Sequence, residues 1–389
     1  MANYYLSFLV TCNIKGLDYR KKKHYLLVVK KHNVEQLNLG GDMRPGNLLI
    51  LVLAAVLTAS SCKESITENI VLVKSPLEMT WTVDTLAYPQ SVQTLMSQIC
   101  AFSKNNIYLV GWSGLVGGEM YRYDGQKWQN VDISPQIGGH RVNRLLGLSP
   151  TNIWGVGYQG ENDLIVNYDG IRWKKESITT KGELYRVDGD SPNNIYALGS
   201  NSTIYYYNGI KWSYEKIRPN IPINIEFGWE SVAVYKGTVL LVGDTRTANH
   251  AKAYMYQGKF NNWVLVDSLD RKYLENEKWG TLVFEKGENG KLFSWGNYFH
   301  EFTGEGWKRI PQPHIKNAGQ GFYVYSDNYM ISLARGVDYF DGKIWQSLPR
   351  FENLNNLLFQ DAWSSGDELF IIANDFNTWP NRTIVFHGK

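Results

Sequence analysis

Tryptophan, tyrosine and arginine side chains are the groups in this 389-residue chain that are best suited to bind a ligand. An aromatic ring offers a flat apolar surface to a side chain or a sugar, and arginine binds carboxylates through a planar pair of donors. Seven of the 14 tryptophans belong to a repeated motif, so the seven outside it are more informative about binding. The candidate binding residues are Trp112, Tyr158, Arg144, Arg186, Trp229, Glu230, Arg246, Trp279, Arg335, Trp379 and Arg382.

Motifs for catalysis are missing from the sequence. The seven histidines are scattered without metal-ligand spacing, and there is no nucleophile elbow, phosphate-binding loop or dinucleotide-binding glycine pattern. Asp188, Glu230, Asp361 and Asp375 could lie near one end of a shared channel, but the sequence cannot pair them. Two facing carboxylates would suit glycoside hydrolysis, so an enzymatic role stays the alternative. We expect no metal and no cofactor.

A repeated turn must position these side chains. Seven times a tyrosine or phenylalanine is followed two residues later by glycine, and six of these turns lead into a tryptophan. The turns begin at Tyr123, Tyr168, Tyr207, Tyr256, Phe302, Phe340 and Phe386, and the tryptophans are Trp128, Trp173, Trp212, Trp263, Trp307 and Trp345. The last turn has no tryptophan after it, whereas Trp81 stands alone before the first complete unit. A unit divided between the two ends is what a closed ring requires.

Each unit has the pattern of four short antiparallel strands. In residues 184–217, alternating segments are separated by Ser191-Pro192-Asn193-Asn194 and by Asn208-Gly209, which is a strong hairpin signal. Repetition at roughly 40–50 residues predicts a β-propeller. We therefore expect an all-β, seven-bladed propeller of four-stranded blades over residues 78–389. The strand around Trp81 is expected to complete the last blade and so remove the exposed sheet edges.

The units resemble a group of propeller-like repeats in bacterial secreted proteins and lipoproteins. The shared pattern is Asn-Ile-Tyr/Trp-x-Val-Gly followed by Tyr-Asp-Gly-x-x-Trp, and it is clearest in residues 106–128, 152–173 and 194–212. The resemblance covers about residues 78–389. It implies the propeller fold and says little about function.

One face of such a ring would gather the candidate binding residues. The loops that enter the inner strands and those between the second and third strands of each blade share this face. Aligning the units predicts one inner-strand position for Gln98, Arg144, Arg186, Glu230 and Gln360, with Trp229 and Trp279 one step earlier. The loops between second and third strands add Trp112, Tyr158, Arg246, His250, Tyr298, Arg335, Trp379 and Arg382. Packing between blades explains Trp154, Trp295 and Trp363 equally well.

The front of the chain has the layout of an export signal. Residues 43–61 contain a basic start, an apolar run and small residues before Cys62, and they resemble a bacterial lipoprotein signal peptide. Ala59 departs from the pattern, in which leucine is more usual. The resemblance implies cleavage before Cys62 and a lipid on its thiol. Lys63-Glu64 is similar to the export signal of surface-exposed lipoproteins, and residues 62–77 are expected to be a flexible tether.

Residues 1–42 do not fit this scheme, because a signal peptide belongs at a terminus. We interpret Met43 as the true start and residues 1–42 as a misassigned extension, the alternative being a disordered segment. The formal net charge of the chain is +3, but residues 1–62 carry +5 of it, which leaves −2 for the rest. We expect no binding to nucleic acid. Cys100, in an apolar strand, is expected to be a buried structural thiol.

These observations favour a binding protein over an enzyme. We expect a monomeric propeller, anchored in the membrane through Cys62 at the cell envelope as an outer-membrane lipoprotein, that binds a protein or a glycan without catalysis. The alternatives are a carbohydrate-active hydrolase or lyase with a site at the channel mouth, and a structural subunit of an envelope complex.

Overall fold

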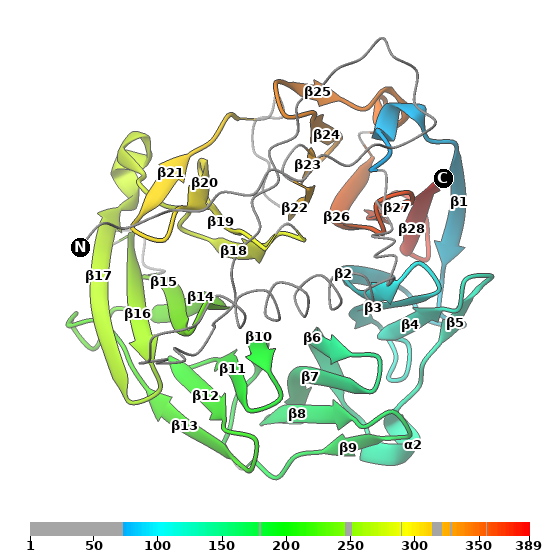
Figure 1. Ribbon diagram of the computed structural model, residues 1–389. Coiled ribbons are helices and arrows are strands. Elements are labelled where there is room, and N and C mark those ends of the chain that lie inside the picture. The colour runs from blue at the N-terminus through cyan, green and yellow to red at the C-terminus, as the bar shows by residue number, and fades with distance from the viewer. Residues whose placement is uncertain are drawn as a thin grey trace, which may run out of the picture. The chain divides into compact units, whose positions relative to one another are not determined.

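Seven four-stranded antiparallel sheets surround a central axis (Figure 1). The computed structural model describes residues 73–389 except 179, 246–250, 289, 313–320, 327–328 and 355. The prediction of an all-β, seven-bladed propeller is confirmed. The predictions for residues 1–72, which include the signal peptide and Cys62, lie outside the described residues. Within these residues, no helix has the length and apolar character needed to cross a membrane.

The first six blades each use four consecutive strands, with the first strand next to the axis and the fourth at the rim (Figure 1). Blades one to three contain β2 (Thr94–Ser103), β3 (Asn106–Ser113), β4 (Met120–Tyr123), β5 (Trp128–Asn130); β6 (Arg141–Ser149), β7 (Asn152–Gln159), β8 (Asn162–Tyr168), β9 (Trp173–Lys175); and β10 (Leu184–Ser191), β11 (Asn194–Gly199), β12 (Thr203–Tyr207), β13 (Trp212–Lys216). Blades four to six contain β14 (Phe227–Tyr235), β15 (Thr238–Thr245), β16 (Lys252–Lys259), β17 (Asn262–Asp270); β18 (Val283–Lys286), β19 (Leu292–Trp295), β20 (Phe299–Phe302), β21 (Trp307–Arg309); and β22 (Gly321–Ser326), β23 (Tyr329–Leu333), β24 (Val337–Phe340), β25 (Trp345–Ser347). The short helices are η1 (Pro76–Glu78), α2 (Ser134–Ile137), η2 (Arg271–Asn276) and η3 (Pro349–Phe351).

The seventh blade joins the two ends of the described chain. It contains β26 (Leu357–Ser364), β27 (Leu369–Asp375) and β28 (Arg382–Gly388), and its rim strand is β1 (Trp81–Leu86). Trp81 pairs with Gly388, which confirms that the strand around Trp81 completes the last blade. Beyond this pair, the backbone groups of Thr80 and Lys389 exchange two hydrogen bonds of 2.9 Å.

The repeated turn forms the hairpin between the third and fourth strands of a blade, which we call the rim hairpin. In blade one, Gly125 has a φ of 95°, a conformation that glycine adopts without strain. The Oδ1 of Asp124 accepts hydrogen bonds of 2.9 Å from the backbone N–H groups of Gln126 and Lys127, and the Tyr123 hydroxyl donates to the Gly125 carbonyl. Trp128 packs on Tyr123 with ring centroids 5.0 Å apart. The hairpin tryptophans are therefore scaffold.

Apolar side chains fill the space between neighbouring blades. One cluster joins blades one and two and includes Cys100, Tyr108, Val142 and Trp173. The Cys100 thiol is buried, and burial raises its pKa to about 12. This agrees with the expected structural role, because a thiol of this kind is not a nucleophile at neutral pH.

Candidate functional site

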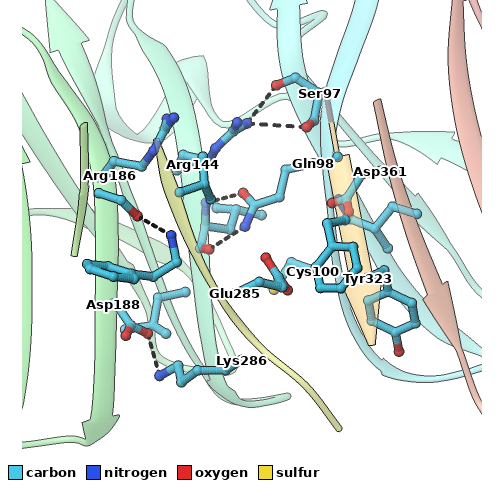
Figure 2. A pocket seen from close by; sticks show the side chains of 18 of the residues that line it. Ser97, Gln98, Cys100, Arg144, Arg186, Asp188, Glu285, Lys286, Tyr323 and Asp361 are labelled. Atoms are coloured by element: carbon cyan, nitrogen blue, oxygen red, sulfur yellow. Dashed lines mark hydrogen bonds and ion pairs between the residues drawn. The ribbon is translucent and has the colours of Figure 1, made fainter. Parts of the chain in front are cut away.

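A cavity of about 580 Å³ lies on the axis of the ring and contacts the inner strand of every blade (Figure 2). Its wall contains both charged side chains and apolar residues of the inner strands. The polar lining residues are Ser97, Gln98, Arg144, Arg186, Asp188, Glu230, Ser231, Glu285, Lys286, Glu288, Tyr323, Gln360 and Asp361. This volume lies in the range of natural ligand sites, so the cavity is the first candidate for function.

Five of the inner strands share a register shift at the same place. In β2 the shift lies between Met96 and Gln98, and β6, β10, β14 and β26 repeat it. A bulge of this kind inserts one extra residue into a strand. The position after the bulge holds Gln98, Arg144, Arg186, Ser231 and Asp361.

This register corrects the sequence alignment. Glu230 and Gln360 line the cavity as expected, but they occupy the inserted position and not the position of Gln98 and the two arginines. The residues equivalent to Gln98 are Ser231 and Asp361. The error arises because the extra residue of a bulge adds length to a strand without changing its pattern of residue types.

Side chains after the bulge join neighbouring blades in three places. The Oδ2 of Asp361 accepts a hydrogen bond of 2.7 Å from the N–H of Ile99, which links blade seven to blade one. The side-chain amide of Gln98 accepts from the N–H of Leu145 at 2.8 Å and donates to its carbonyl at 2.9 Å, which links blade one to blade two.

The third link joins blade four to blade five, where the Ser231 hydroxyl accepts a hydrogen bond of 3.0 Å from the N–H of Phe284. Blades two and three carry arginine at this position. A guanidinium has no acceptor, so it cannot bind the N–H of the next blade. In blade three the link is made by Asp188, two residues later, which accepts from the N–H of Val234 at 2.7 Å.

The two arginines lie at one end of the cavity (Figure 2). The Nη1 of Arg144 donates to the hydroxyl and carbonyl of Ser97 at 2.8 and 3.3 Å, and the Nη1 of Arg186 donates to the Tyr185 carbonyl at 3.0 Å. Burial, together with the smaller effect of the neighbouring charge of Arg186, lowers the pKa of Arg144 to about 10. Among residues that the structure describes, neither arginine forms an ion pair.

The carboxyl groups of the cavity have different surroundings. Burial raises the pKa of Asp361 to about 6 and that of Glu285 well above its ordinary value, the latter also because Asp361 and Asp188 are near. Asp188 forms an ion pair of 2.6 Å with Lys286. Asp375 is absent from the cavity wall and instead binds the loop after β27. Within the described part of the chain, no group of three or more His, Cys, Asp or Glu side chains is arranged to hold a metal.

An aromatic and arginine stack lies where β6 begins. The Arg141 guanidinium lies 4.6 Å from the ring centroid of Trp112 and 5.8 Å from that of Tyr158, and it donates to the Tyr158 hydroxyl at 3.1 Å. Trp112 and Tyr158 are thus brought together, as predicted for one face. Arg141 was not among the predicted site residues, although its place three residues before Arg144 in the same strand was an available signal.

Three loops near the seam of blades seven and one expose apolar side chains. The N–H of Asn381 donates to the Val92 carbonyl at 3.1 Å, and the N–H of Gly114 donates to the Gln93 carbonyl at 3.2 Å. These bonds hold the loop between β27 and β28 next to the loops before β2 and after β3. The exposed residues, which we call the apolar loop patch, are Val92, Leu115, Val116, Phe376 and Trp379. Trp379 is 76% exposed, whereas Arg382 at the same loop pairs with Asp375.

Two other predicted binding residues are not accessible. Trp229 is 0% exposed and donates its indole N–H to the Ser202 carbonyl, and Trp279 is 2% exposed and donates to Asp267. They pack between blades, so their assignment to the binding face was an error. Arg335 is exposed in the loop between β23 and β24. Arg246 and His250 lie outside the described residues.

Comparison with known proteins identifies the fold. No protein-family model matches the chain, and no curated protein sequence matches it. The structure of YCF48 bound to D1 peptide is 15% identical, covers 81% of this chain and 96% of its own, and has a TM-score of 0.53. YCF48 from Cyanidioschyzon merolae is 14% identical, covers 78% of this chain and 98% of its own, and has a TM-score of 0.51. At this identity the likeness shows the propeller fold alone.

Proposed function

We propose that the propeller is a non-enzymatic binding module for a protein partner. The observation that carries this proposal is the apolar loop patch, because Trp379 and Phe376 are 76% and 49% exposed on a loop that is hydrogen-bonded to its neighbours. Contiguous apolar side chains on a soluble surface mark interaction sites, and tryptophan is typical of their energetic centre. The similar propeller YCF48, solved with a bound peptide, supports this use of the fold.

A protein fits the patch better than a glycan does. The three loops that are hydrogen-bonded together here also expose the aliphatic side chains of Val92, Leu115 and Val116. A sugar needs hydrogen-bonding groups around the ring on which it stacks, whereas an apolar side chain of a protein does not.

The cavity supports binding more than glycoside hydrolysis. That reaction needs two carboxyl groups that act on the substrate. Both oxygens of Asp361 accept backbone hydrogen bonds, from Ile99 and Ala362, and Asp188 is occupied by Lys286 and Val234. Glu288 accepts a hydrogen bond from the Tyr323 hydroxyl, so three of the carboxyl groups that line the cavity are already engaged by the protein.

The experiment is capture of cross-linked partners from cell envelopes by the full-length protein. The patch variant is Trp379→Ala with Phe376→Ser. The matched control is Ile171→Ser, which removes a side chain 88% exposed at the rim hairpin of blade two. We expect the native protein and the control to capture the same partner and the patch variant to lose it. Equal capture by all three proteins would contradict the proposal.

We further propose that the propeller is attached to the cell envelope through a lipid on Cys62. The support is the signal-like layout of residues 43–61 directly before this cysteine. Metabolic labelling with a fatty acid, followed by mass spectrometry, should find the lipid on Cys62 and none of residues 1–61. A Cys62→Ser variant should stay unlabelled, and label elsewhere in that variant would refute the assignment.

A further inference from the structure

The central cavity is chemically asymmetric along its axis. Figure 2 shows the side chains of Arg144 and Arg186 at one end, close to Ser97, while Asp188 and Lys286 lie at the other end. The arginine end is also the side on which the inner strands begin, because Arg144 follows the Arg141 stack at the start of β6. The two arginines therefore lie toward the side of the ring on which the inner strands begin, which is the side of the predicted loop face.

The two arginines have donors to spare. Every hydrogen bond that Arg144 and Arg186 make within the described chain starts from Nη1. Their Nε and Nη2 groups bind no described residue, although a guanidinium offers five N–H donors. The bond from Arg144 to Ser97 restricts the orientation of its guanidinium, so the remaining donors are held in place for a ligand.

Structure alone does not explain arginine at these positions. The equivalent residues Gln98, Ser231 and Asp361 bind the backbone of the next blade, whereas the two arginines do not. In blades two and three this contact is made by Asn143 and Asp188 instead, so the arginines are not needed for it. Two partly buried cations side by side also repel each other, and this repulsion adds to the effect of burial in lowering the pKa of Arg144. A bound anion would remove this cost by neutralising the pair.

A carboxylate matches the pair better than a phosphate does. Arginine binds both groups with two parallel hydrogen bonds. The cavity also contains the carboxyl groups of Glu230, Glu285 and Asp361. The negative charge of Glu230 attracts the guanidinium of Arg186. A dianion would be repelled by these groups more strongly than a single negative charge.

We infer that Arg144 and Arg186 bind a carboxylate of the partner protein, either its C-terminal carboxylate or the side chain of an aspartate or glutamate. This inference rests on the proposed function for the source of the carboxylate. A cavity of about 580 Å³ has room for the end of a peptide or one acidic side chain.

Binding of small probes tests the site directly. N-acetyl-alanine presents a C-terminal carboxylate, N-acetyl-aspartate N-methylamide presents an acidic side chain, and N-acetyl-alanine amide presents neither. We expect saturation-transfer NMR with the full-length protein to detect at least one carboxylate probe and not the amide. The probe that binds more tightly identifies the source.

The variants are Arg144→Gln and Arg186→Gln, with Arg172→Gln, an exposed arginine of a rim hairpin, as the matched control. We expect the Kd of the bound probe to rise at least tenfold in each cavity variant and to stay unchanged in the control. Arg186→Lys keeps the charge without the planar donor pair, and it should give an intermediate Kd. It also supplies the test if a glutamine variant does not fold.

Two results would overturn the inference: no carboxylate probe binds the native protein better than the amide, or the cavity variants bind it as well as the control. Failure of the proposed function looks different. If the patch variant still captures the partner while the probes bind through the arginines, the apolar loop patch is not the surface that binds the partner. The assignment of the carboxylate site is then still supported.

Discussion

Neighbouring blades are held together by hydrogen bonds from side chains near the axis. The seam between blades one and two uses different residues for this than the seam between blades two and three. Gln98 makes two hydrogen bonds to the backbone of Leu145 in the next blade. Arg144, at the equivalent position one blade later, makes none to its next blade and turns back to Ser97 in the previous one. A residue at this position that makes no hydrogen bond to the next blade is therefore a candidate for binding.

The seam between blades seven and one allows the sharpest test, because its link can ionise. Burial raises the pKa of Asp361 to about 6 from an ordinary 3.8. Between these pH values the folded protein keeps a proton that the unfolded chain has lost. The free energy of unfolding therefore falls as the pH rises from 4 to 6, by about 3 kcal/mol at most.

Urea unfolding at a series of pH values measures this effect against an Asp361→Asn variant, which cannot ionise. We expect the stability difference between the two proteins to shift in favour of the variant across that range. If the free energies of unfolding of the two proteins change with pH in parallel, the pKa of Asp361 is not raised by burial at this seam.

The neutral link between blades one and two should give the next largest effect. Gln98→Ala leaves the N–H and the carbonyl of Leu145 without their partners, and we expect a loss of about 2 kcal/mol in the free energy of unfolding. The loss should not depend on pH, unlike that at Asp361. A loss below about 0.5 kcal/mol would mean that Gln98 is not a structural link.

The arginine positions should behave in the opposite way. Arg144→Gln removes a repelling charge, which offsets the loss of its hydrogen bonds to Ser97, and it gives up no bond to the next blade. We therefore expect the free energy of unfolding to fall by no more than about 1 kcal/mol, or to rise. Thermal unfolding of the variant beside Gln98→Ala provides the comparison. If the two variants lose the same free energy of unfolding, Arg144 is a structural residue like Gln98 and is not distinguished as a binding residue.

Trp379→Ala should have the smallest effect on folding. The side chain is 76% exposed, so its removal takes little apolar surface out of the core. We expect a change within about 0.5 kcal/mol in urea unfolding, together with the loss of partner capture. A stability loss of several kcal/mol would assign Trp379 to the scaffold.

The fold could be predicted from the sequence because each blade repeats its signals. The Asp124 turn and its tryptophan recur in register, and Trp81 was the one part of the pattern out of place. The site was harder to predict. An inserted bulge residue shifted Glu230 and Gln360 by one position, and a bulge has no reliable sequence mark. Whether Trp229 plugs a gap or faces solvent is decided by neighbouring blades that are far away in the sequence.

The closure of the last blade has a further consequence for protein engineering. The backbone groups of Thr80 and Lys389 are hydrogen-bonded to each other, so these two positions in the chain are already adjacent. A short covalent linker between them would close the backbone into a circle, and the chain could then be opened at a rim hairpin of another blade. Such a circular permutant should keep the cavity and the loop patch, while its new ends could carry a fused domain at whichever blade is chosen.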